Sequence, residues 1–292
     1  MEIKLYYLIL AHKNLSQVKR LISSLGHSHA KFFLHIDRKV GTSEIHEQSF
    51  GQMKNVVVVR PRINIHWGGF SMVQATLLLL KRASVEKQKG YYILLSGQDF
   101  PLKSSNQIFD FLATRYGNEY LEYFYLPSSN WGMSGGLDRI NYYWFIDSIG
   151  KKESQYLYEL QKNENHRRPF FDGLAPCGGS QWWCLTDECV AFILAFVGKY
   201  QIFHDYYRHC FIPDEMFFQT IILNSTFRDK VVNNNLRHID WVSGPQHPKI
   251  LQEIDLDSLI ASDNLWARKF ETNQSNMLDK LEEHMHSRQG DV

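Results

Sequence analysis

The sequence predicts an α/β protein with a mainly parallel central sheet and helices on both faces. Three predominantly apolar runs, 5–10, 31–36 and 91–95, have the length of buried strands. Helical patterns follow them, and this alternation is typical of a parallel sheet covered by helices. The 292 residues, of which 44% are hydrophobic, supply enough apolar side chains for a large packed core.

The first 125 residues alternate strands and helices. Asn14 followed by Gln17 resembles a capping box, and Gly26 falls where a helix would end. Ser71 and Gln74 are candidate caps for the next helix. The expected elements, in order, are a strand at 5–10, a helix from Leu15 to Leu25, strands at 31–36 and 56–59, a helix through Leu77–Leu80, a strand at 91–95 and a helix from Ser104 or Ser105 to Tyr116.

The second half is less regular. The expected elements are a loop and strand within 178–185, a helix opened by Thr186 and closed at Gly198, a helix at 216–223 opened by Pro213, a strand at 236–241, a short helix at 256–262 and a polar helix at 273–288. Since no Pro/Gly/Ser-rich linker divides the chain, we predict one domain. It would hold a nucleotide-binding half (1–125), an acceptor-binding and catalytic half (126–272) and a C-terminal helix (273–292).

Charge and cysteine content exclude several classes of protein. The 32 Lys and Arg residues nearly balance the 31 Asp and Glu residues, so no global field would attract nucleic acid. The apolar runs are too short for a signal peptide or a transmembrane helix. The four cysteines form no disulfide framework, and reduced thiols are typical of a cytoplasmic protein.

Polar residues follow the predicted strands at 11–13, 35–39, 65–69 and 96–100. Open parallel sheets bind ligands at the carboxyl ends of their strands, so these segments are the first candidates for a nucleotide site. Each one alone is equally compatible with an ordinary solvated loop or a helix cap. Their joint occurrence favours a binding site.

Several well-known motifs are missing. There is no Gly-x-Gly-x-x-Gly after the first strand, no P-loop, no Gly-x-Ser-x-Gly and no zinc-type His/Cys spacing. The only Asp-x-Asp, at 255–257, lies at a predicted helix start, where capping explains it better than metal binding. A departing diphosphate would therefore be neutralised by Lys and Arg, and 267–270 (Ala-Arg-Lys-Phe) is the candidate segment, unless it is a solvated basic pair.

Glu215 is the candidate general base. Transfer of an activated sugar to an alcohol requires a carboxylate that removes the hydroxyl proton. The alternative for the acids of Pro213-Asp214-Glu215 is stabilisation of the first helical turn. The pattern alone favours that structural role.

Seven segments together resemble the core-2/I-branching β-1,6-N-acetylglucosaminyltransferase and peptide O-xylosyltransferase family. They run in order through nearly the whole chain: Ala11-His12-Lys13, Leu34-His35-Ile36-Asp37, Trp67-Gly68-Gly69 with Val73-Gln74-Ala75, 94–103 (Leu-Leu-Ser-Gly-Gln-Asp-Phe-Pro-Leu-Lys), Gly179-Ser180-Gln181-Trp182, Pro213-Asp214-Glu215 and 267–270. The block around Ser96–Lys103, followed by Pro213-Asp214-Glu215 and then by 267–270, is specific.

The resemblance implies a GT-A-type nucleotide-sugar transferase fold, an inverting displacement, a UDP-sugar donor carrying GlcNAc or a xylose-like sugar, and no metal. Glu215 inherits the role of catalytic base. The expected donor and UDP-binding residues are His12, Asp37, Trp67, Lys249, Arg268 and Lys269. Lys269 would contact the diphosphate, with Lys249 as second cation and Arg268 as the alternative. The expected acceptor-binding residues are Asp99, Glu122, Trp182 and Trp183.

The sequence lacks the membrane anchor, stem and disulfide cysteines of the animal enzymes, so we expect a bacterial, cytoplasmic member that contacts the inner face of the membrane at most peripherally. A glycan or lipid-linked saccharide of polysaccharide biosynthesis is the expected acceptor. Two alternatives stay open, namely a non-catalytic protein that binds a carbohydrate or nucleotide sugar, and a metal-dependent glycosyltransferase using Asp99. Trp67, Trp182 and Trp183 would form sugar platforms, although aromatic residues mostly serve the core.

Overall fold

The computed structural model describes residues 2–242, 247–271 and 276–287. The chain forms two compact units. Unit 1 consists of Met1–Arg60, Gln88–Tyr116 and Leu236–Val292, and unit 2 consists of Pro61–Lys87 and Gly117–Asn235. Each unit combines helices and strands, which confirms the predicted α/β class.

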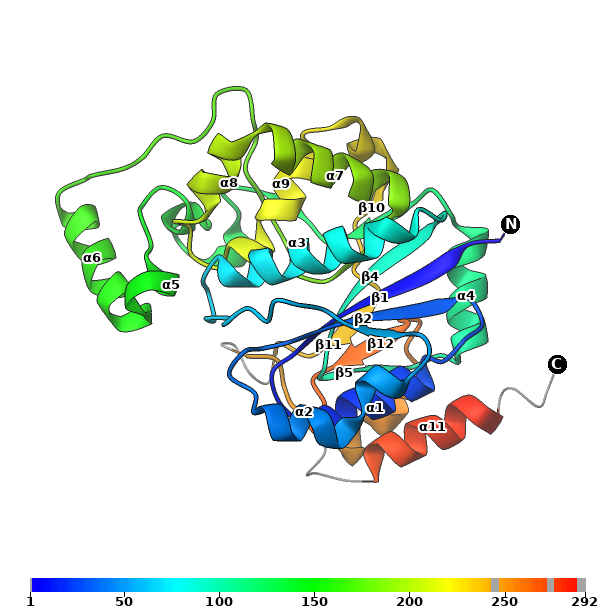
Figure 1. The fold of residues 1–292 in the computed structure, drawn as a ribbon. Helices are drawn as coiled ribbons and strands as arrows, with labels where there is room; N and C mark the ends of the chain where they lie inside the picture. The colour runs from blue at the N-terminus through cyan, green and yellow to red at the C-terminus, as the bar shows by residue number, and fades with distance from the viewer. Residues whose placement is uncertain (1, 243–246, 272–275, 288–292) are drawn as a thin grey trace. The chain divides into compact units, whose positions relative to one another are not determined.

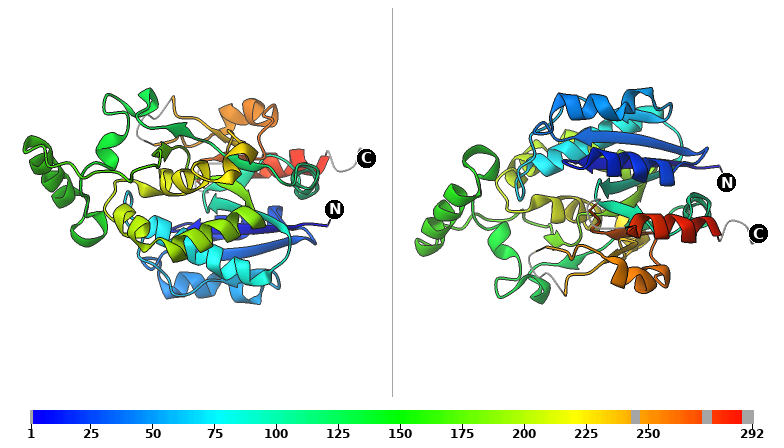
Figure 2. Two further views of the ribbon diagram at one scale, coloured as in Figure 1. Left: turned by 90° about the horizontal axis from the view of Figure 1, so that it is seen from above. Right: turned by 90° about the horizontal axis from the view of Figure 1, so that it is seen from below.

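The main sheet of unit 1 contains four parallel strands in the order β4-β1-β2-β3. These are β1 (Lys4–Ala11), β2 (Ala30–Ile36), β3 (Val56–Val58) and β4 (Gly90–Ser96). Residues Leu5–Ala11 of β1 and all of β4 are buried, as expected for strands covered on both faces. The parallel course of β1 and β2 is visible in Figure 1 and Figure 2. All four strands confirm the sequence prediction.

The helices of unit 1 are α1 (Leu15–Ser24), α2 (Thr42–Gln48), α4 (Ser105–Thr114), α10 (Leu256–Ile260) and α11 (Met277–Ser287), with 3₁₀ turns η1 (Phe50–Gln52) and η7 (Glu253–Asp255). Figure 1 shows α1 and α2 next to each other, with α11 beside α1. Arg20 of α1 holds α11 through Asp279 and Glu282, at 2.5 and 2.7 Å. Of the predicted C-terminal segment, 272–275 and 288–292 lie outside the described residues.

Two predicted helix caps differ from the structure, and one is confirmed. Asn14 adopts a left-handed conformation (φ 50°) and its side chain caps nothing, so the capping box with Gln17 is wrong. Gln17 is fully buried instead and donates to the carbonyls of Gly97 and Phe270, at 3.2 and 3.1 Å. The start of α4 is as predicted, because Ser104 and Gln107 form a reciprocal capping box.

A second, three-stranded sheet in unit 1 has the order β11-β12-β5. It consists of β5 (Asp99–Pro101), β11 (Arg237–Ile239) and β12 (Trp266–Arg268). β12 pairs parallel with β11 and antiparallel with β5, so Arg268 lies opposite Asp99. The strand predicted at 236–241 is therefore present but shorter.

Unit 2 contains the strand run β10-β6-β9 and the pair β7-β8. The strands are β6 (Glu119–Leu121), β7 (Phe124–Tyr125), β8 (Cys177–Gly178), β9 (Trp183–Thr186) and β10 (Val231–Val232). β6 is parallel to β10 and antiparallel to β9. Parallel pairing therefore prevails in unit 1, and both directions occur in unit 2.

The helices of unit 2 are α3 (Ser71–Ala83), α5 (Ile146–Ile149), α6 (Lys151–Asn163), α7 (Asp187–Lys199), α8 (Gln201–Tyr207) and α9 (Phe217–Leu223). The 3₁₀ turns are η2 (Ser84–Glu86), η3 (Ser129–Trp131), η4 (Leu137–Arg139), η5 (Pro213–Glu215) and η6 (Thr226–Lys230). Figure 1 shows α6 away from α3, α7, α8 and α9 of this unit. The sequence predicted α7 and α9 but gave no signal for α5 and α6.

An aromatic cluster anchors the segment that carries α5 and α6. Trp144 stacks on Phe211 and on Tyr158, each with ring centroids 4.5 Å apart. Phe211 lies just before the turn that holds Glu215, separated from it by Ile212. The same cluster therefore stabilises the position of that turn. Among the described residues, no helix is long and apolar enough to cross a membrane.

Candidate functional site

A group of charged side chains gathers at the carboxyl edge of the unit 1 sheet. We call it the basic cluster; its members are His12, Lys13, Lys39, Arg268 and Lys269, with the carboxylates Asp37 and Glu271. His12 and Lys13 follow β1, and Asp37 follows the parallel strand β2. The amide of Asp37 donates to the carbonyl of Ala11 at 2.8 Å, which brings the two strand ends together. This is the edge at which parallel sheets bind ligands.

Burial, and then neighbouring positive charge, shift the pKa values of His12 and Lys269 in the basic cluster. Burial lowers the pKa of His12, and Lys13 lowers it further, while Asp37 acts in the opposite direction. Burial and the neighbouring Lys13 lower the pKa of Lys269 as well. A bound anion would reverse these effects, because it stabilises the protonated forms. The cluster is thus suited to a ligand with more than one negative charge.

Lys13 is tied to the segment after β12. Its ammonium lies 2.5 Å from Oε1 of Glu271, and the amide of Gln98 donates to the same oxygen at 3.1 Å. The amide of Phe270 in turn donates to the carbonyl of Gln98 at 2.9 Å. These bonds hold the ends of β1 and β12 close together, so Lys13 joins Lys269 in the same charged neighbourhood.

Asp99 is fully buried and lies between two guanidinium groups. Its carboxylate oxygens are 3.7 Å from Nε of Arg268 and 3.8 Å from Nε of Arg237. The amide of Ser96 also donates to it at 3.0 Å. With no accessible surface, Asp99 is placed to hold Arg268 rather than to contact an acceptor sugar, which departs from the sequence prediction.

Lys249 donates to Asp255 at 2.7 Å, so its ammonium already has a carboxylate partner. Asp255 also accepts from the amide of Gln252 in the capping box of η7, as the sequence analysis expected for this acid. The backbone of Lys249 runs beside that of Lys269. Of the two predicted second cations, only Arg268 acts electrostatically on Lys269.

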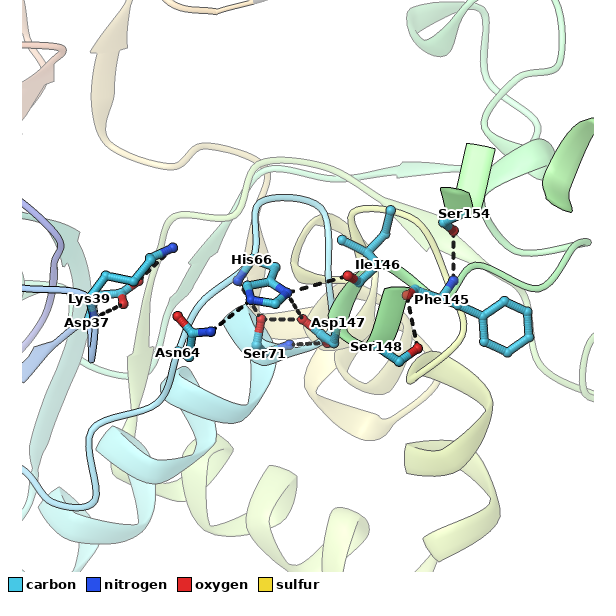
Figure 3. Close-up of polar contacts among 10 residues, drawn as sticks. All are labelled: Asp37, Lys39, Asn64, His66, Ser71, Phe145, Ile146, Asp147, Ser148 and Ser154. Atoms are coloured by element: carbon cyan, nitrogen blue, oxygen red, sulfur yellow. Dashed lines mark hydrogen bonds and ion pairs between the residues drawn. The ribbon is translucent and has the colours of Figure 1, made fainter. Parts of the chain in front are cut away.

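Asp37, the predicted nucleoside contact, is buried at the end of β2. Oδ1 accepts from the backbone amide of Lys39 at 2.9 Å, and Oδ2 lies 3.4 Å from the Lys39 ammonium, as Figure 3 shows. The turn after β2 therefore fixes the aspartate. Lys39 itself keeps 58% of its side chain exposed.

Glu215, the predicted base, ends the 3₁₀ turn η5 in unit 2. The preceding Ile212 has a left-handed backbone (φ 50°), and its amide donates to the carbonyl of Gly68 at 2.9 Å. A β-branched residue in this conformation is strained, and such strain is concentrated at functional sites. The amide of Gly179 donates to the carbonyl of Glu215 at 2.9 Å. Two separate segments, those of Gly68 and Gly179, thus fix the backbone of this turn.

Three ionisable groups, Arg139, Asp214 and Glu122, contact the side chain of Glu215 or are coupled to it electrostatically. Oε2 accepts a hydrogen bond from Nη1 of Arg139 at 2.8 Å. Burial and the charge of Glu215 raise the pKa of Asp214 to about 7 and raise that of Glu122. Glu122 accepts from the amide of Asn235 at 2.7 Å. The structure therefore brings together two predicted residues, Glu215 and Glu122, and adds Arg139, for which the sequence gave no signal.

Gly179 has room for no side chain. A Cβ atom built on it would lie 1.9 Å from the carbonyl oxygen of Glu122. Because that oxygen is a backbone atom, it could make room for a side chain at position 179 only if β6 or η5 moved. The glycine of the Gly-Ser-Gln-Trp segment thus allows the chain carrying Glu122 to approach the chain carrying Glu215.

The three predicted sugar-platform tryptophans are all in unit 2 and differ in exposure. Trp67 is 50% exposed, lies edge-on to Phe211, and has the ammonium of Lys151 4.3 Å from its ring centroid. Trp182 is 7% exposed. Trp183 is fully buried against Phe218, so it serves the core of unit 2 and not a sugar platform. Trp67 is the one of the three whose ring is accessible.

A polar network fixes the loop that carries Trp67. Figure 3 shows Asp147 pointing at the start of α3, where it accepts from the amide and hydroxyl of Ser71 at 2.9 and 2.6 Å. His66 lies beside them, and its amide donates to the Ser71 hydroxyl at 2.9 Å. The predicted cap by Ser71 and Gln74 is wrong, because Asp147 from α5 satisfies this helix end.

Throughout 2–242, 247–271 and 276–287, no three His, Cys, Asp or Glu side chains form a group that could hold a metal ion. The four cysteines are buried as free thiols, as expected.

The structure is thus an α/β protein with a cluster of basic side chains at one sheet edge and a carboxylate, Glu215, held by Arg139. The chain belongs to the Core-2/I-Branching enzyme family, which matches residues 5–259. This membership confirms the resemblance, and with the parallel sheet it confirms the predicted GT-A-type α/β fold class. Bacterial origin stays a prediction.

Two curated relatives illustrate the similarity. Xylosyltransferase 1 of Homo sapiens is 26% identical over 250 residues, which cover 82% of this chain and 24% of that protein. Xylosyltransferase 2 of Canis lupus familiaris is 25% identical over 251 residues, covering 82% of this chain and 27% of that protein. The chain therefore spans about a quarter of the length of the curated relatives it matches.

Among solved structures, S. aureus TarS in complex with UDP-GlcNAc aligns with 57% of this chain and 49% of its own. The TM-score is 0.32 and the sequence identity 12%.

Proposed function

We propose that the chain is an inverting, metal-independent glycosyltransferase that moves a sugar from a UDP-sugar to a hydroxyl of a glycan acceptor. The observation that carries the proposal is the setting of Glu215. It ends the Pro-Asp-Glu turn of a Core-2/I-Branching chain, two other segments fix the backbone of that turn, and 26% of the Glu215 side chain is accessible. A carboxylate held in this way is suited to accept a proton from an alcohol.

In the proposed reaction, Glu215 takes the proton of the acceptor hydroxyl. The acceptor oxygen forms a bond to the anomeric carbon on the face opposite the diphosphate. The bond between that carbon and the diphosphate oxygen breaks, and the oxygen leaves with the bonding electron pair as UDP. Glu122, with its position fixed by Asn235, is the proposed contact for the acceptor sugar.

In unit 1, the basic cluster would bind the diphosphate. Lys269 is the first cation, as the sequence analysis expected, and Arg268 and Lys13 are the additional ones. Charge-assisted hydrogen bonds from these groups would stabilise the negative charge that develops on UDP as it leaves. Asp37 and His12 are the proposed contacts of the nucleoside side of the donor.

Metal independence is proposed from the chemistry of the available ligands. Asp99, the carboxylate that a metal-dependent alternative would use, already faces the guanidinium groups of Arg237 and Arg268. Bringing a divalent cation to a carboxylate with two positive neighbours is electrostatically unfavourable. Addition of EDTA should accordingly leave the transfer rate unchanged, and strong inhibition would favour the metal-dependent alternative.

The similarity to xylosyltransferases makes UDP-xylose a donor to test beside UDP-GlcNAc. The proposed acceptors are a glycan or a lipid-linked saccharide. A cytoplasmic location, with peripheral membrane contact, stays a prediction.

The decisive experiment compares wild type with Glu215→Gln. UDP, UDP-GlcNAc and UDP-xylose binding is measured by calorimetry, and transfer is measured as UDP release with and without nitrophenyl glycoside acceptors. The variant should lose transfer by roughly 10²- to 10⁴-fold, the usual contribution of a general base, and keep its affinity for UDP. Glu159→Gln, an exposed carboxylate of α6, is the matched control and should behave like wild type.

Transfer by Glu215→Gln at the wild-type rate would refute the role of the base. Binding of UDP-sugars without turnover by the wild type, for every acceptor offered, would favour the non-catalytic alternative. Failure of UDP to bind at all would refute the donor class.

A further inference from the structure

The side chain of Arg139 is held on both sides. Its Nη1 donates to Oε2 of Glu215 at 2.8 Å, and its guanidinium carbon lies 3.6 Å from the centroid of the Trp131 ring. Only 17% of the Arg139 side chain is exposed. A guanidinium stacked on an indole ring loses little further freedom when it binds a carboxylate, so its direction is preset.

Trp131 is itself fixed by its surroundings. Its ring is edge-on to Phe124, with centroids 4.9 Å apart. A Cβ atom built on Gly178 would lie 2.5 Å from the same ring, so the absence of a side chain there admits the indole. The ring that supports Arg139 is therefore part of a packed layer and not a mobile surface group.

The backbone of Arg139 is bonded to the segment that leads to Glu215. Its carbonyl accepts from the amide of Phe211 at 2.9 Å, and Phe211 is followed by Ile212 and by the turn η5. Backbone and side chain thus connect η4 to η5 at two points. A change in the position of one turn would be transmitted to the other.

Arg139 also supplies positive charge where carboxylates accumulate. Asp214 and Glu122 are both coupled to the charge of Glu215, and the pKa of Asp214 is lowered by Arg139 against the larger effects of burial and of Glu215. Carboxylates that share a site take up protons at higher pH unless a cation compensates them. A protonated Glu215 could not act as a base.

We propose that Arg139, supported by Trp131, is a positioning residue that orients the Glu215 carboxylate and keeps it ionised among Glu122 and Asp214. This inference rests on the proposed role of Glu215 as the base. It deepens that role, since it assigns the group that makes the carboxylate usable at neutral pH.

The test uses two variants. Arg139→Met keeps most of the side-chain volume but removes the charge, and Arg139→Lys keeps the charge but lacks the planar guanidinium with its several donors. The kcat/KM for transfer is measured from pH 5 to 9, with UDP affinity by calorimetry and thermal stability in parallel. Arg228→Met is the matched control, because that exposed side chain of η6 pairs with its sequence neighbour Asp229.

Arg139→Met should lower kcat/KM at neutral pH by roughly 10- to 100-fold, the value of one charge-assisted hydrogen bond. The acidic limb of its pH profile should move to higher pH, because loss of a neighbouring cation favours the protonated carboxylate. Arg139→Lys should have a kcat/KM between those of Arg139→Met and wild type, and its acidic limb should lie close to the wild-type pH. Trp131→Phe should have a kcat/KM between those of wild type and Arg139→Met. UDP affinity should stay unchanged in all of them.

A fall in kcat/KM without movement of the acidic limb would overturn the inference, because a merely structural role predicts that result. So would wild-type kinetics in Arg139→Met. If Arg139→Met does not fold, the same two outcomes apply to Arg139→Lys and Trp131→Phe. Unimpaired transfer by Glu215→Gln would instead refute the base itself, which distinguishes failure of the proposed function from failure of this inference.

Discussion

The ammonium of Lys13 lies 2.5 Å from the carboxylate of Glu271, although 258 positions separate them in the sequence. Lys13 follows the first strand of unit 1, and Glu271 follows the last. The carboxylate partly neutralises a cation that an incoming diphosphate would otherwise meet with its full charge. Lys13 and Glu271 should therefore affect donor binding in opposite directions.

Replacement of Lys13 or Lys269 by Ala should weaken UDP binding. Each removes one charge-assisted hydrogen bond to the diphosphate, so the Kd for UDP should rise by roughly 10- to 100-fold. Calorimetry at two salt concentrations measures the effect, which should shrink as screening increases. Lys81→Ala, an exposed lysine of α3, serves as control.

Glu271→Gln should tighten UDP binding, since it removes a negative charge from the cluster while an amide can still accept from Lys13. The expected decrease in Kd is a few-fold, in line with a partly exposed charge. A weaker affinity for UDP in this variant would contradict the proposed donor cluster.

Glu122→Gln should lower kcat/KM for the acceptor without changing the affinity for UDP. The charged hydrogen bond to an acceptor hydroxyl is worth about 1.5–3 kcal/mol, so kcat/KM for the acceptor should fall by roughly tenfold or more. The Kd for UDP should equal that of wild type, and Glu159→Gln again provides the control. A loss of UDP affinity with an unchanged acceptor KM would assign Glu122 to the donor instead.

The stability of the fold should fall as pH rises from about 4.5 to about 7. Burial raises the pKa of Glu119 to about 7, even though Thr186 donates to both carboxylate oxygens, at 2.8 and 2.6 Å. Across this pH range the folded state binds more protons than the unfolded state, so the unfolding free energy decreases with pH, by up to about 3 kcal/mol for this group. Asp214, with its pKa also raised to about 7, acts in the same direction.

The measurement is thermal or urea unfolding at pH 5, 6, 7 and 8 for wild type and Glu119→Gln. The amide oxygen of glutamine can accept from the Thr186 backbone amide, and its NH2 group can donate to the Thr186 hydroxyl. Neither bond involves a titratable proton, so the pH slope should be shallower in the variant. Equal slopes in the two proteins would contradict the assignment.

Gly179→Ala should destabilise unit 2 and disturb the candidate base. The new Cβ would lie 1.9 Å from the carbonyl oxygen of Glu122, and overpacking of this kind costs about 1–3 kcal/mol or more. Gly198→Ala is the matched control, because nothing lies within 4 Å of a Cβ at that position of α7. Alanine there should raise the midpoint of thermal unfolding, by the helix propensity it gains.

The four main strands of unit 1 and the polar residues after them were predictable from the sequence. Apolar runs of strand length are local features, and the residues that follow a parallel strand reach the same sheet edge whatever the details of packing. His12 and Asp37 lie in segments found in this way, whereas Lys269 was predicted from the basic segment 267–270 and the family resemblance. The caps of α1 and α3 were not, because Gln17 turns into the core and Asp147 comes from a distant helix.

Residues whose role depends on a distant partner were decided by the tertiary structure alone. Arg139 and Glu215 are 76 positions apart, and their contact depends on how η4, η5 and the ring of Trp131 are placed. The burial of Asp99 beneath two arginines and of Trp183 in the core likewise follows from three-dimensional packing. Sequence patterns indicate the period of a helix or strand and the residues at its ends. The partner of a charged or aromatic side chain depends instead on tertiary contacts, which no local pattern encodes.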